Sequence, residues 1–195
     1  VETGGIAYSP DGNFLFANIH HKSSSPQLEK WDMKSGTLSA SFNVKQVYPS
    51  IAASASKVLM TGGFKNLLFG KTTPEIDIYD AETGSFVRSD TPTTIASYYR
   101  VWAISILQDG ENYAIYSVPN TFLEVINLSD PALRRQIPLG NSSGVINAHF
   151  SHNGAFALVT FQDSSVSVFK TSDGMLLQTL KLPARANAGD VSSDG

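Results

Sequence analysis

A strong turn signal recurs along the chain at nearly regular intervals, and it limits the possible folds more than any other feature. The first copy is Ser-Pro-Asp-Gly at residues 9–12, between two short apolar runs. Equivalent turns lie at 56–57, 109–110, 153–154 and 194–195, so the second turn position recurs after 45, 53, 44 and 41 residues. Asn or Asp followed by Gly favours the positive φ angles of a two-residue hairpin. Each copy therefore predicts a tight turn between antiparallel strands.

A second landmark keeps step with this turn. It is a short strand end with a large apolar residue in its middle, at residues 30–32, 78–80, 125–127 and 168–170. Three copies are followed by a turn ending in Gly36, Gly84 or Gly174, and the fourth by Ser-Asp-Pro at 129–131. In the last unit the predicted strands are 145–150, 155–161, 165–169 and 175–180. Their alternating apolar residues are typical of strands, and no segment shows a sustained helical stripe.

Four strands for every 40–45 residues are typical of propeller blades. We therefore predict an all-β chain, a β-propeller built of four-stranded antiparallel blades with about four blades present. The predicted blades span 5–44, 47–90, 99–139 and 144–182. Residues 183–195 are expected to start a further blade or to form a closing strand.

The repeated unit resembles the WD-repeat β-propellers over nearly the whole chain. IAYSPDGNFLFA at 6–17 looks like the first two strands of a blade of that family, and LEKWDMKSGTLSASF at 28–42 looks like the last two, with Trp31-Asp32 as the signature dipeptide. Residues 161–180 also fit, with Asp163 where such blades often place a turn-bracing Asp. Only one unit has Trp-Asp and none opens with Gly-His, and residues 154–174 are also similar to YVTN-type bacterial propellers.

This resemblance implies a ring of usually seven blades, so the four units are interpreted as part of a larger ring. The sequence starts without Met and stops on a turn, from which we expect a piece of a longer polypeptide. An open arc, a fragment, or half of a ring closed by a second copy would each have four blades. The open edge of an arc would leave apolar faces and strand groups unpaired.

Composition argues against several classes of function. The net charge is −3 and the pI is about 5.8, whereas proteins that bind nucleic acid or anionic membranes usually carry a basic face. The sequence has no apolar run of the roughly 18 residues that a membrane helix needs. Cys is absent, which excludes disulfides, thiol catalysis and thiolate metal sites.

Residues that could carry chemistry have ordinary interpretations. We interpret His20, His21, His149 and His152 as solvated loop residues and expect no metal site, because zinc needs three or four converging ligands. The carboxylates at 75, 77, 80 and 82 are interpreted as a solvated face. The sequence has no G-x-S-x-G elbow and no phosphate-binding glycine loop, so no catalytic residue and no cofactor is predicted.

Two segments are candidates for binding partners. The central loop of the second unit, predicted at 62–71, carries four large apolar residues, and the connection into the third unit carries aromatic residues and an arginine. Such side chains contribute most of the binding energy at protein interfaces. The predicted contact residues are Phe64, Leu67, Leu68, Phe69, Tyr98, Tyr99 and Arg100. Alternatively, residues 67–69 end a strand packed between blades, and Trp102 is expected to be buried.

The leading functional hypothesis is a non-enzymatic WD-repeat-like propeller that acts as a rigid scaffold for protein–protein interaction. Its expected partners are other proteins, and either further blades of the same chain or a second copy to close the ring, without nucleic acid or membrane insertion. The alternative is a YVTN-like propeller that binds a ligand or acts as a lactonase-like hydrolase. The scaffold would be cytoplasmic, and the YVTN-like protein secreted or periplasmic.

Overall fold

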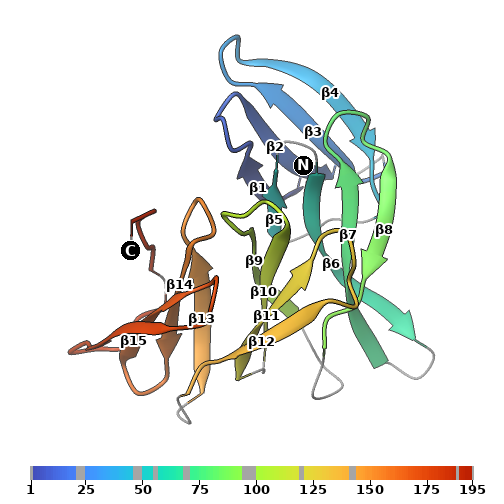
Figure 1. The fold of residues 1–195 in the computed structure, drawn as a ribbon. Coiled ribbons are helices and arrows are strands. Elements are labelled where there is room, and N and C mark those ends of the chain that lie inside the picture. Colours follow the sequence, from blue (N-terminus) through green and yellow to red (C-terminus); the bar gives the residue numbers. More distant parts are fainter. Residues whose placement is uncertain are drawn as a thin grey trace. The chain divides into compact units, whose positions relative to one another are not determined.

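The computed structural model consists of strands and their connections (Figure 1). It describes residues 2–20, 25–45, 50–54, 57–67, 71–93, 100–118, 121–140, 144–187 and 189–194. Within these residues sixteen strands form four antiparallel sheets of four strands each, and each sheet follows chain order. The predicted all-β class and the four-stranded antiparallel blades are confirmed. None of the described residues belongs to a helix that is long and apolar enough to cross a membrane.

Each blade is a meander of four consecutive strands. Blade 1 contains β1 (Glu2–Tyr8), β2 (Phe14–His20), β3 (Gln27–Asp32) and β4 (Thr37–Asn43). Blade 2 contains β5 (Ser50–Ala53), β6 (Lys57–Leu67), β7 (Lys71–Asp80) and β8 (Phe86–Asp90). Blade 3 contains β9 (Arg100–Ile106), β10 (Asn112–Val118), β11 (Phe122–Asn127) and β12 (Arg134–Pro138). Blade 4 contains β13 (Val145–Phe150), β14 (Phe156–Phe161), β15 (Ser165–Lys170) and β16 (Leu176–Lys181).

The chain divides into two compact units, Val1–Pro92 with blades 1 and 2, and Thr93–Gly195 with blades 3 and 4. Within each unit the first strands of the two blades contact each other, β1 with β5 and β9 with β13. Gly5 shows how close this approach is, because a Cβ there would lie 2.8 Å from the backbone nitrogen of Ile51. The two blades of each unit therefore stack through their first strands.

Each unit has one apolar core, which lies between its two blades. In the first unit Phe16 and Leu28 of blade 1 pack with Ile51 and Tyr79 of blade 2. In the second unit the core joins both blades in the same way; it contains Ala103, Leu107, Ala114, Tyr116, Leu123, Val125, Ile137, Leu139, Ala148, Ala157, Val159, Phe161 and Phe169. We call the face with which blade 2 packs on blade 1 and blade 4 packs on blade 3, and the equivalent face of blades 1 and 3, the upstream face. A blade buries its apolar residues against a neighbour rather than within itself.

The turns between first and second strands lie where the sequence predicts them, but three of them are longer than two residues. In blade 1, Ser9 N–H donates to Phe14 O and Gly12 N–H donates to Ser9 O, both at 2.9 Å. The same pair of bonds starts from Leu107 and from Ser151 in blades 3 and 4. The predicted two-residue form is therefore wrong for these three turns. In blade 2, Ser54 N–H donates to Lys57 O at 2.7 Å, and residues 55–56 lie outside the described part.

The physical reason is the role of the Asp or Asn side chain. Asp11 accepts from Ser9 Oγ at 2.5 Å and from Asn13 N–H at 3.0 Å. Asn153 accepts from Ser151 Oγ at 2.8 Å in the equivalent place. The side chain thus closes the loop locally, and only the following glycine needs a positive φ, 71° at Gly12.

The turns between third and fourth strands are also closed by carboxylates in blades 1 and 2. Asp32 accepts from the backbone N–H and the hydroxyl of Ser35, at 2.8 and 2.9 Å. Asp80 accepts from the same two groups of Thr83, both at 2.8 Å. Hydrogen bonds from these residues hold the pKa of each carboxyl below its usual range.

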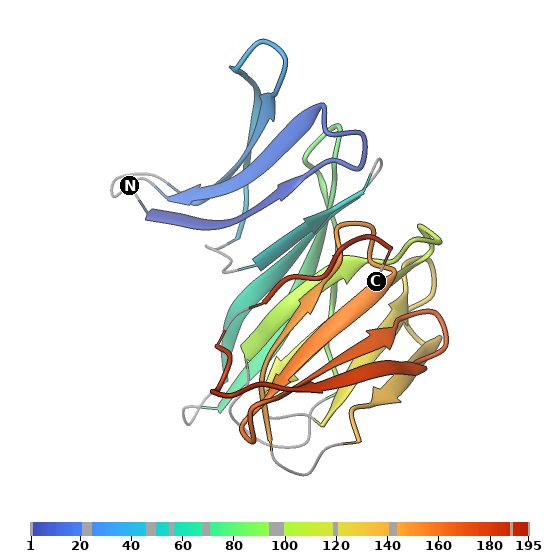
Figure 2. The same ribbon diagram turned by 90° about the vertical axis from the view of Figure 1, so that its left-hand side faces the viewer.

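Two further segments depart from or extend the sequence prediction. The predicted central loop of blade 2 is mostly strand, because Phe64 pairs with Pro74 and Leu67 pairs with Lys71. After β16 the chain runs beside β13 (Figure 2), where Asn147 Nδ2 donates to Asn187 O at 3.5 Å and Asn153 Nδ2 donates to Ser193 O at 3.1 Å. Both contacts join residues 40 positions apart, one blade length. We call residues 183–194 the tail.

Candidate interaction surfaces

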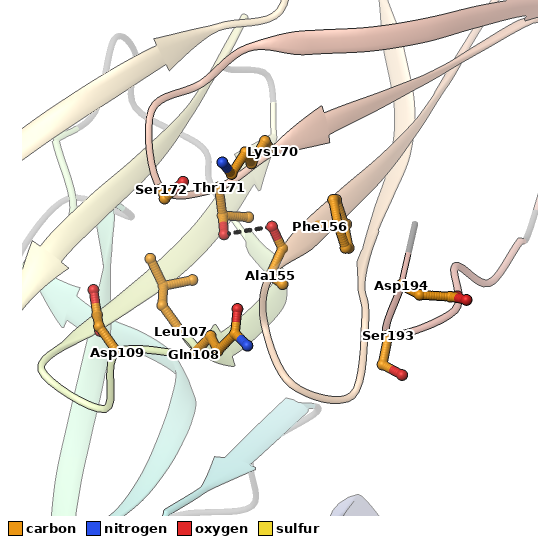
Figure 3. Close-up of a pocket in the computed structure, with 10 residues that line it drawn as sticks. All are labelled: Leu107, Gln108, Asp109, Ala155, Phe156, Lys170, Thr171, Ser172, Ser193 and Asp194. Carbon is orange, nitrogen blue, oxygen red and sulfur yellow. Dashed lines mark hydrogen bonds between the residues drawn. The ribbon is translucent and has the colours of Figure 1, made fainter.

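A pocket of about 420 Å³ opens where blades 3 and 4 meet at their turns (Figure 3). The turn after β9, the start of β14, the turn after β15 and the tail each contribute to its wall. Its described lining consists of Leu107, Gln108, Asp109, Ala155, Phe156, Lys170, Thr171, Ser172, Ser193 and Asp194. We call it the seam pocket. Leu107 and Phe156 give it an apolar part, and exposed polar side chains surround them.

Hydrogen bonds between the turns fix the wall of the seam pocket. The buried hydroxyl of Thr171 lies 2.6 Å from the carbonyl oxygen of Gly154 and 2.9 Å from that of Ala155, and donates to them. Figure 3 shows the second of these bonds. From blade 3, Arg135 Nη2 donates to the carbonyl oxygens of Thr171 and, at 2.8 Å, Ser172. The polar backbone of this wall is satisfied by the protein itself, so the pocket is preformed.

Gly154 lies at the same seam in a place that no side chain can share. A Cβ at Gly154 would lie 2.1 Å from the carbonyl oxygen of Ile106 and 2.8 Å from the Cα atom of Leu107. Its φ of +67° also favours glycine. The equivalent Gly12 of blade 1 has a similar φ, but nothing in the described structure lies within 4 Å of its virtual Cβ. The turn of blade 4 is therefore packed directly on the backbone of blade 3.

A row of side chains with a carboxylate at its third position crosses the upstream face of each of the first three blades. In blade 1 the register pairs Ile6 with Ala17, Ala17 with Glu29, and Glu29 with Ser41. The equivalent rows are Ile51–Met60–Asp77–Ser89, Ile104–Ile115–Glu124–Gln136 and, without a carboxylate, Ala148–Val159–Ser167–Thr179. We call this the acid row. Cross-strand partners share one face of a sheet, so the four rows occupy equivalent places.

The carboxylates of the acid row are buried. Asp77 is 0% exposed and Glu124 is 2% exposed. The interpretation of Asp77 as part of a solvated face is therefore wrong. The reason is that a blade can have a neighbour on each of its two faces. A polar residue that alternates with Ile76 and Ile78 can therefore be buried although it lies on the other face of the strand. Exposed Glu82 agrees with the interpretation.

Residues of the incoming linker bind these buried carboxylates. Lys45, between blades 1 and 2, donates from Nζ to Asp77 Oδ1 at 3.2 Å and to Ser89 Oγ at 3.0 Å. Thr93, which precedes blade 3, donates from its N–H to Glu124 Oε2 at 2.7 Å and from its hydroxyl to Oε1 at 2.6 Å. Arg134 adds a bond to Glu124 at 3.1 Å. The acid row thus attaches the incoming linker to blade 2 and to blade 3.

The upstream face of blade 1 carries large exposed apolar side chains in and beside its acid row. A second row pairs Tyr8 with Leu15, Leu15 with Trp31, and Trp31 with Leu38. Ile6 is 58% exposed, Tyr8 48% and Leu38 46%. At the position of Ile6, Ile51 of blade 2 and Ala148 of blade 4 are 7% and 1% exposed. The position of Leu38 is exposed in these blades as well, at Phe86 and Leu176. Blade 1 therefore exposes its first strand at a place where blades 2 and 4 bury theirs.

The seven predicted contact residues lie largely outside the described part of the structure. Phe64 and Leu67 lie on β6 and Arg100 begins β9, where it pairs with Val118, but their side chains are not described. Leu68, Phe69, Tyr98 and Tyr99 fall outside the described residues, as does the side chain of Trp102. The assignment of these seven residues to a partner stays a prediction.

Two of the histidines are not in solvated loops. His20 lies on β2 and His149 on β13, both half-buried, and His149 Nε2 is buried without a hydrogen-bond partner among the described residues. His152 lies exposed in the turn before β14, as predicted, and His21 is outside the described part. The described residues contain no group of three or more His, Cys, Asp or Glu side chains that could hold a metal ion.

Asp163 braces the turn between β14 and β15, as the family resemblance implies. Its Oδ1 accepts from the N–H of Ser165 at 2.9 Å and from the hydroxyl of Ser165 at 2.6 Å.

The adjacent basic residues Arg134 and Arg135 both form contacts within the fold. Arg134 binds Glu124, and Arg135 binds the turn of blade 4.

The seam pocket and the acid row were not predicted. The acid row had a sequence signal, a carboxylate three residues before the landmark ends Asp32, Asp80 and Asn127.

Comparison with solved structures confirms the β-propeller fold. The chain is similar to the Cps50 (Swd1) β-propeller domain of Myceliophteria thermophila, with a TM-score of 0.66 and 11% identity, over 94% of this chain and 56% of that chain. It is also similar to the dihydro-heme d1 dehydrogenase NirN in complex with DHE, with a TM-score of 0.64 and 17% identity, over 94% of this chain and 38% of that chain.

At these identities the likeness shows the fold alone. No family model matches the sequence, and no curated protein does. The chain spans little more than half of the first structure and less than two fifths of the second, which fits an incomplete ring.

Proposed function

We propose that this chain is a non-enzymatic propeller scaffold that binds protein partners, with the seam pocket as a contact point. The observation that carries the proposal is the preformed pocket, where apolar Leu107 and Phe156 are surrounded by exposed polar side chains. An apolar centre with a polar rim is typical of places where a partner's side chain is desolvated. Because its turns are held by Thr171 and Arg135, binding there would cost little ordering of the protein.

The chemistry of the pocket supports binding rather than catalysis. A hydrolase of the lactonase-like kind needs a nucleophile next to a general base. The described lining offers the hydroxyls of Thr171, Ser172 and Ser193 but contains no histidine. The Thr171 hydroxyl, which is the buried one, already donates to backbone carbonyls. The YVTN-like ligand-binding or hydrolytic propeller remains the rival function.

A second proposed contact surface is the set of seven residues predicted from the sequence. Leu68→Ala and Tyr99→Ala should weaken partner binding while leaving the melting temperature nearly unchanged, because truncating an interface anchor typically costs more than about 1 kcal/mol of binding energy. If these residues instead pack between blades, both variants lose stability, by about 2–5 kcal/mol for the leucine. Thermal melts beside binding titrations separate the two results.

Site-specific photo-crosslinking tests the seam pocket directly. A benzoylphenylalanine at exposed Gln108, on the pocket rim, should capture a defined protein partner, and the same probe at exposed Gln178 on β16 should not. Gln108→Arg should then weaken binding of the purified partner at least tenfold, with Gln178→Arg as the matched control. Equal capture at both positions, or hydrolysis of a lactone substrate that Gln108→Arg abolishes, would contradict the scaffold proposal.

A further inference from the structure

Glu29 differs from Asp77 and Glu124 in what binds it. Asp77 is bound by Lys45 and Glu124 by Thr93, donors that lie 32 and 31 residues earlier in the chain. Glu29 is 8% exposed, and within the described residues its one donor is Trp31 Nε1 at 2.9 Å, from the same strand. The donor from an incoming linker is thus present for two carboxylates of the acid row and missing for the first.

The spacing in blades 2 and 3 indicates where the donor for Glu29 would lie. At the same distance of 31 or 32 residues, it would precede Val1. Burying a carboxylate costs free energy unless hydrogen-bond donors compensate it. The buried carboxylate of an acid row therefore needs a donor from the incoming linker. The first strand of blade 1 also lacks a cover, since Ile6 is 58% exposed and its equivalent in blade 2, Ile51, is 7% exposed.

We propose that the upstream face of blade 1 is the docking surface for a further blade of the same polypeptide, encoded immediately before Val1, whose outgoing linker donates a hydrogen bond or an ammonium group to Glu29. The downstream face of that blade packs on Ile6 and Tyr8, as the face of blade 1 with Phe16 and Leu28 packs on blade 2. This inference rests on the repeat geometry and not on the proposed scaffold function.

A second copy of the chain is the weaker occupant because of the tail. A copy docking through blade 4 would have to place its β1 beside β13, as β13 lies beside β9 and β5 beside β1. The tail already takes that place, through Asn187 and Ser193. Gly189 lies against Leu158 and Val191 is buried, so the tail is packed rather than loosely attached.

The experiment compares the 195-residue chain with a chain extended by the roughly 45 residues, one blade repeat, that the gene encodes before Val1. Both carry Trp102→Phe, which leaves Trp31 as the single tryptophan of residues 1–195, and any tryptophan among the added residues is likewise replaced by Phe. In the extended chain the emission of Trp31 should shift to the blue and its quenching by acrylamide should fall severalfold. Glu29→Gln should lower the melting temperature of the extended chain about as much as Asp77→Asn does, and that of the shorter chain by less than half as much. Asp77→Asn, the matched control, should act equally on both chains.

Several results would overturn the proposal. One is a gene in which no strand-forming repeat precedes Val1. Another is an extended chain in which Trp31 stays as quenched as in the shorter one, a reading that needs no substitution at Glu29. A third is a 195-residue chain that sediments as a dimer and becomes monomeric with Ile6→Asp, which would make a second copy the occupant.

Discussion

Blades 1 and 2 carry the same upstream face in two different settings. The rows have the same register, with an isoleucine, a carboxylate and a serine at equivalent places, Ile6–Glu29–Ser41 and Ile51–Asp77–Ser89. Ile6 is 58% exposed, whereas Ile51 is 7% exposed. The difference is the preceding blade, which blade 2 has and blade 1 lacks within the described structure. In this fold the neighbour, and not the strand's own pattern, decides which residues are core.

The largest expected effect compares two turn glycines. Gly154→Ala should destabilise the protein by about 3–5 kcal/mol, because the new Cβ adds an overlap with the backbone of Ile106 and Leu107 to the cost of its positive φ. Gly12→Ala should cost about 1–2 kcal/mol, the cost of the φ alone. Denaturant unfolding of both variants measures the difference. Equal losses would mean that the turn of blade 4 is not packed on blade 3.

The next effect compares the two isoleucines of the acid row. Ile51→Ala should cost about 2–4 kcal/mol, since it leaves a cavity in the core between blades 1 and 2. Ile6→Ala should cost less than about 1 kcal/mol, because its side chain already contacts water. Chemical denaturation with both variants in the 195-residue chain provides the measurement. If Ile6→Ala costs as much as Ile51→Ala, the face of blade 1 is covered in that chain.

The smallest effect is a pH dependence that the preceding blade should not influence. Asp32 and Asp80 have a pKa below the ordinary 3.8 because Ser35 and Thr83 donate hydrogen bonds to them. A lowered folded-state pKa gives stability that is present above the unfolded value and is lost as pH falls through the folded value, so the loss occurs below about pH 4. Asp32→Asn and Asp80→Asn should each make the melting temperature slightly less sensitive to acid in that range. If the acid sensitivity of the melting temperature changes more for one variant than for the other, the preceding blade also affects the turn between the third and fourth strands.

The strands and turn positions were predictable from the sequence, and the burial of single residues was not. Alternation and regularly spaced Asn/Asp-Gly pairs are local, so residues 145–150 were assigned to a strand with the bounds that β13 has. Asp77 was misjudged because alternation separates two faces of a strand but does not show that both have neighbours. The seam pocket joins Leu107, Phe156 and Thr171, whose proximity depends on how blades stack. The length of β6 was missed because the glycines and Lys65 resemble loop residues.

Hydroxyl-radical labelling tests the comparison between the two faces most directly, because it reads side-chain exposure without a substitution. Tyr8 and Tyr79 have the same intrinsic reactivity, and they lie on the upstream faces of blades 1 and 2 with exposures of 48% and 2%. In the 195-residue chain the account predicts that Tyr8 is oxidised many times faster than Tyr79, as read by mass spectrometry of the peptides that contain them. Equal protection of the two tyrosines would contradict it, because the face of blade 1 would then be covered without any preceding blade.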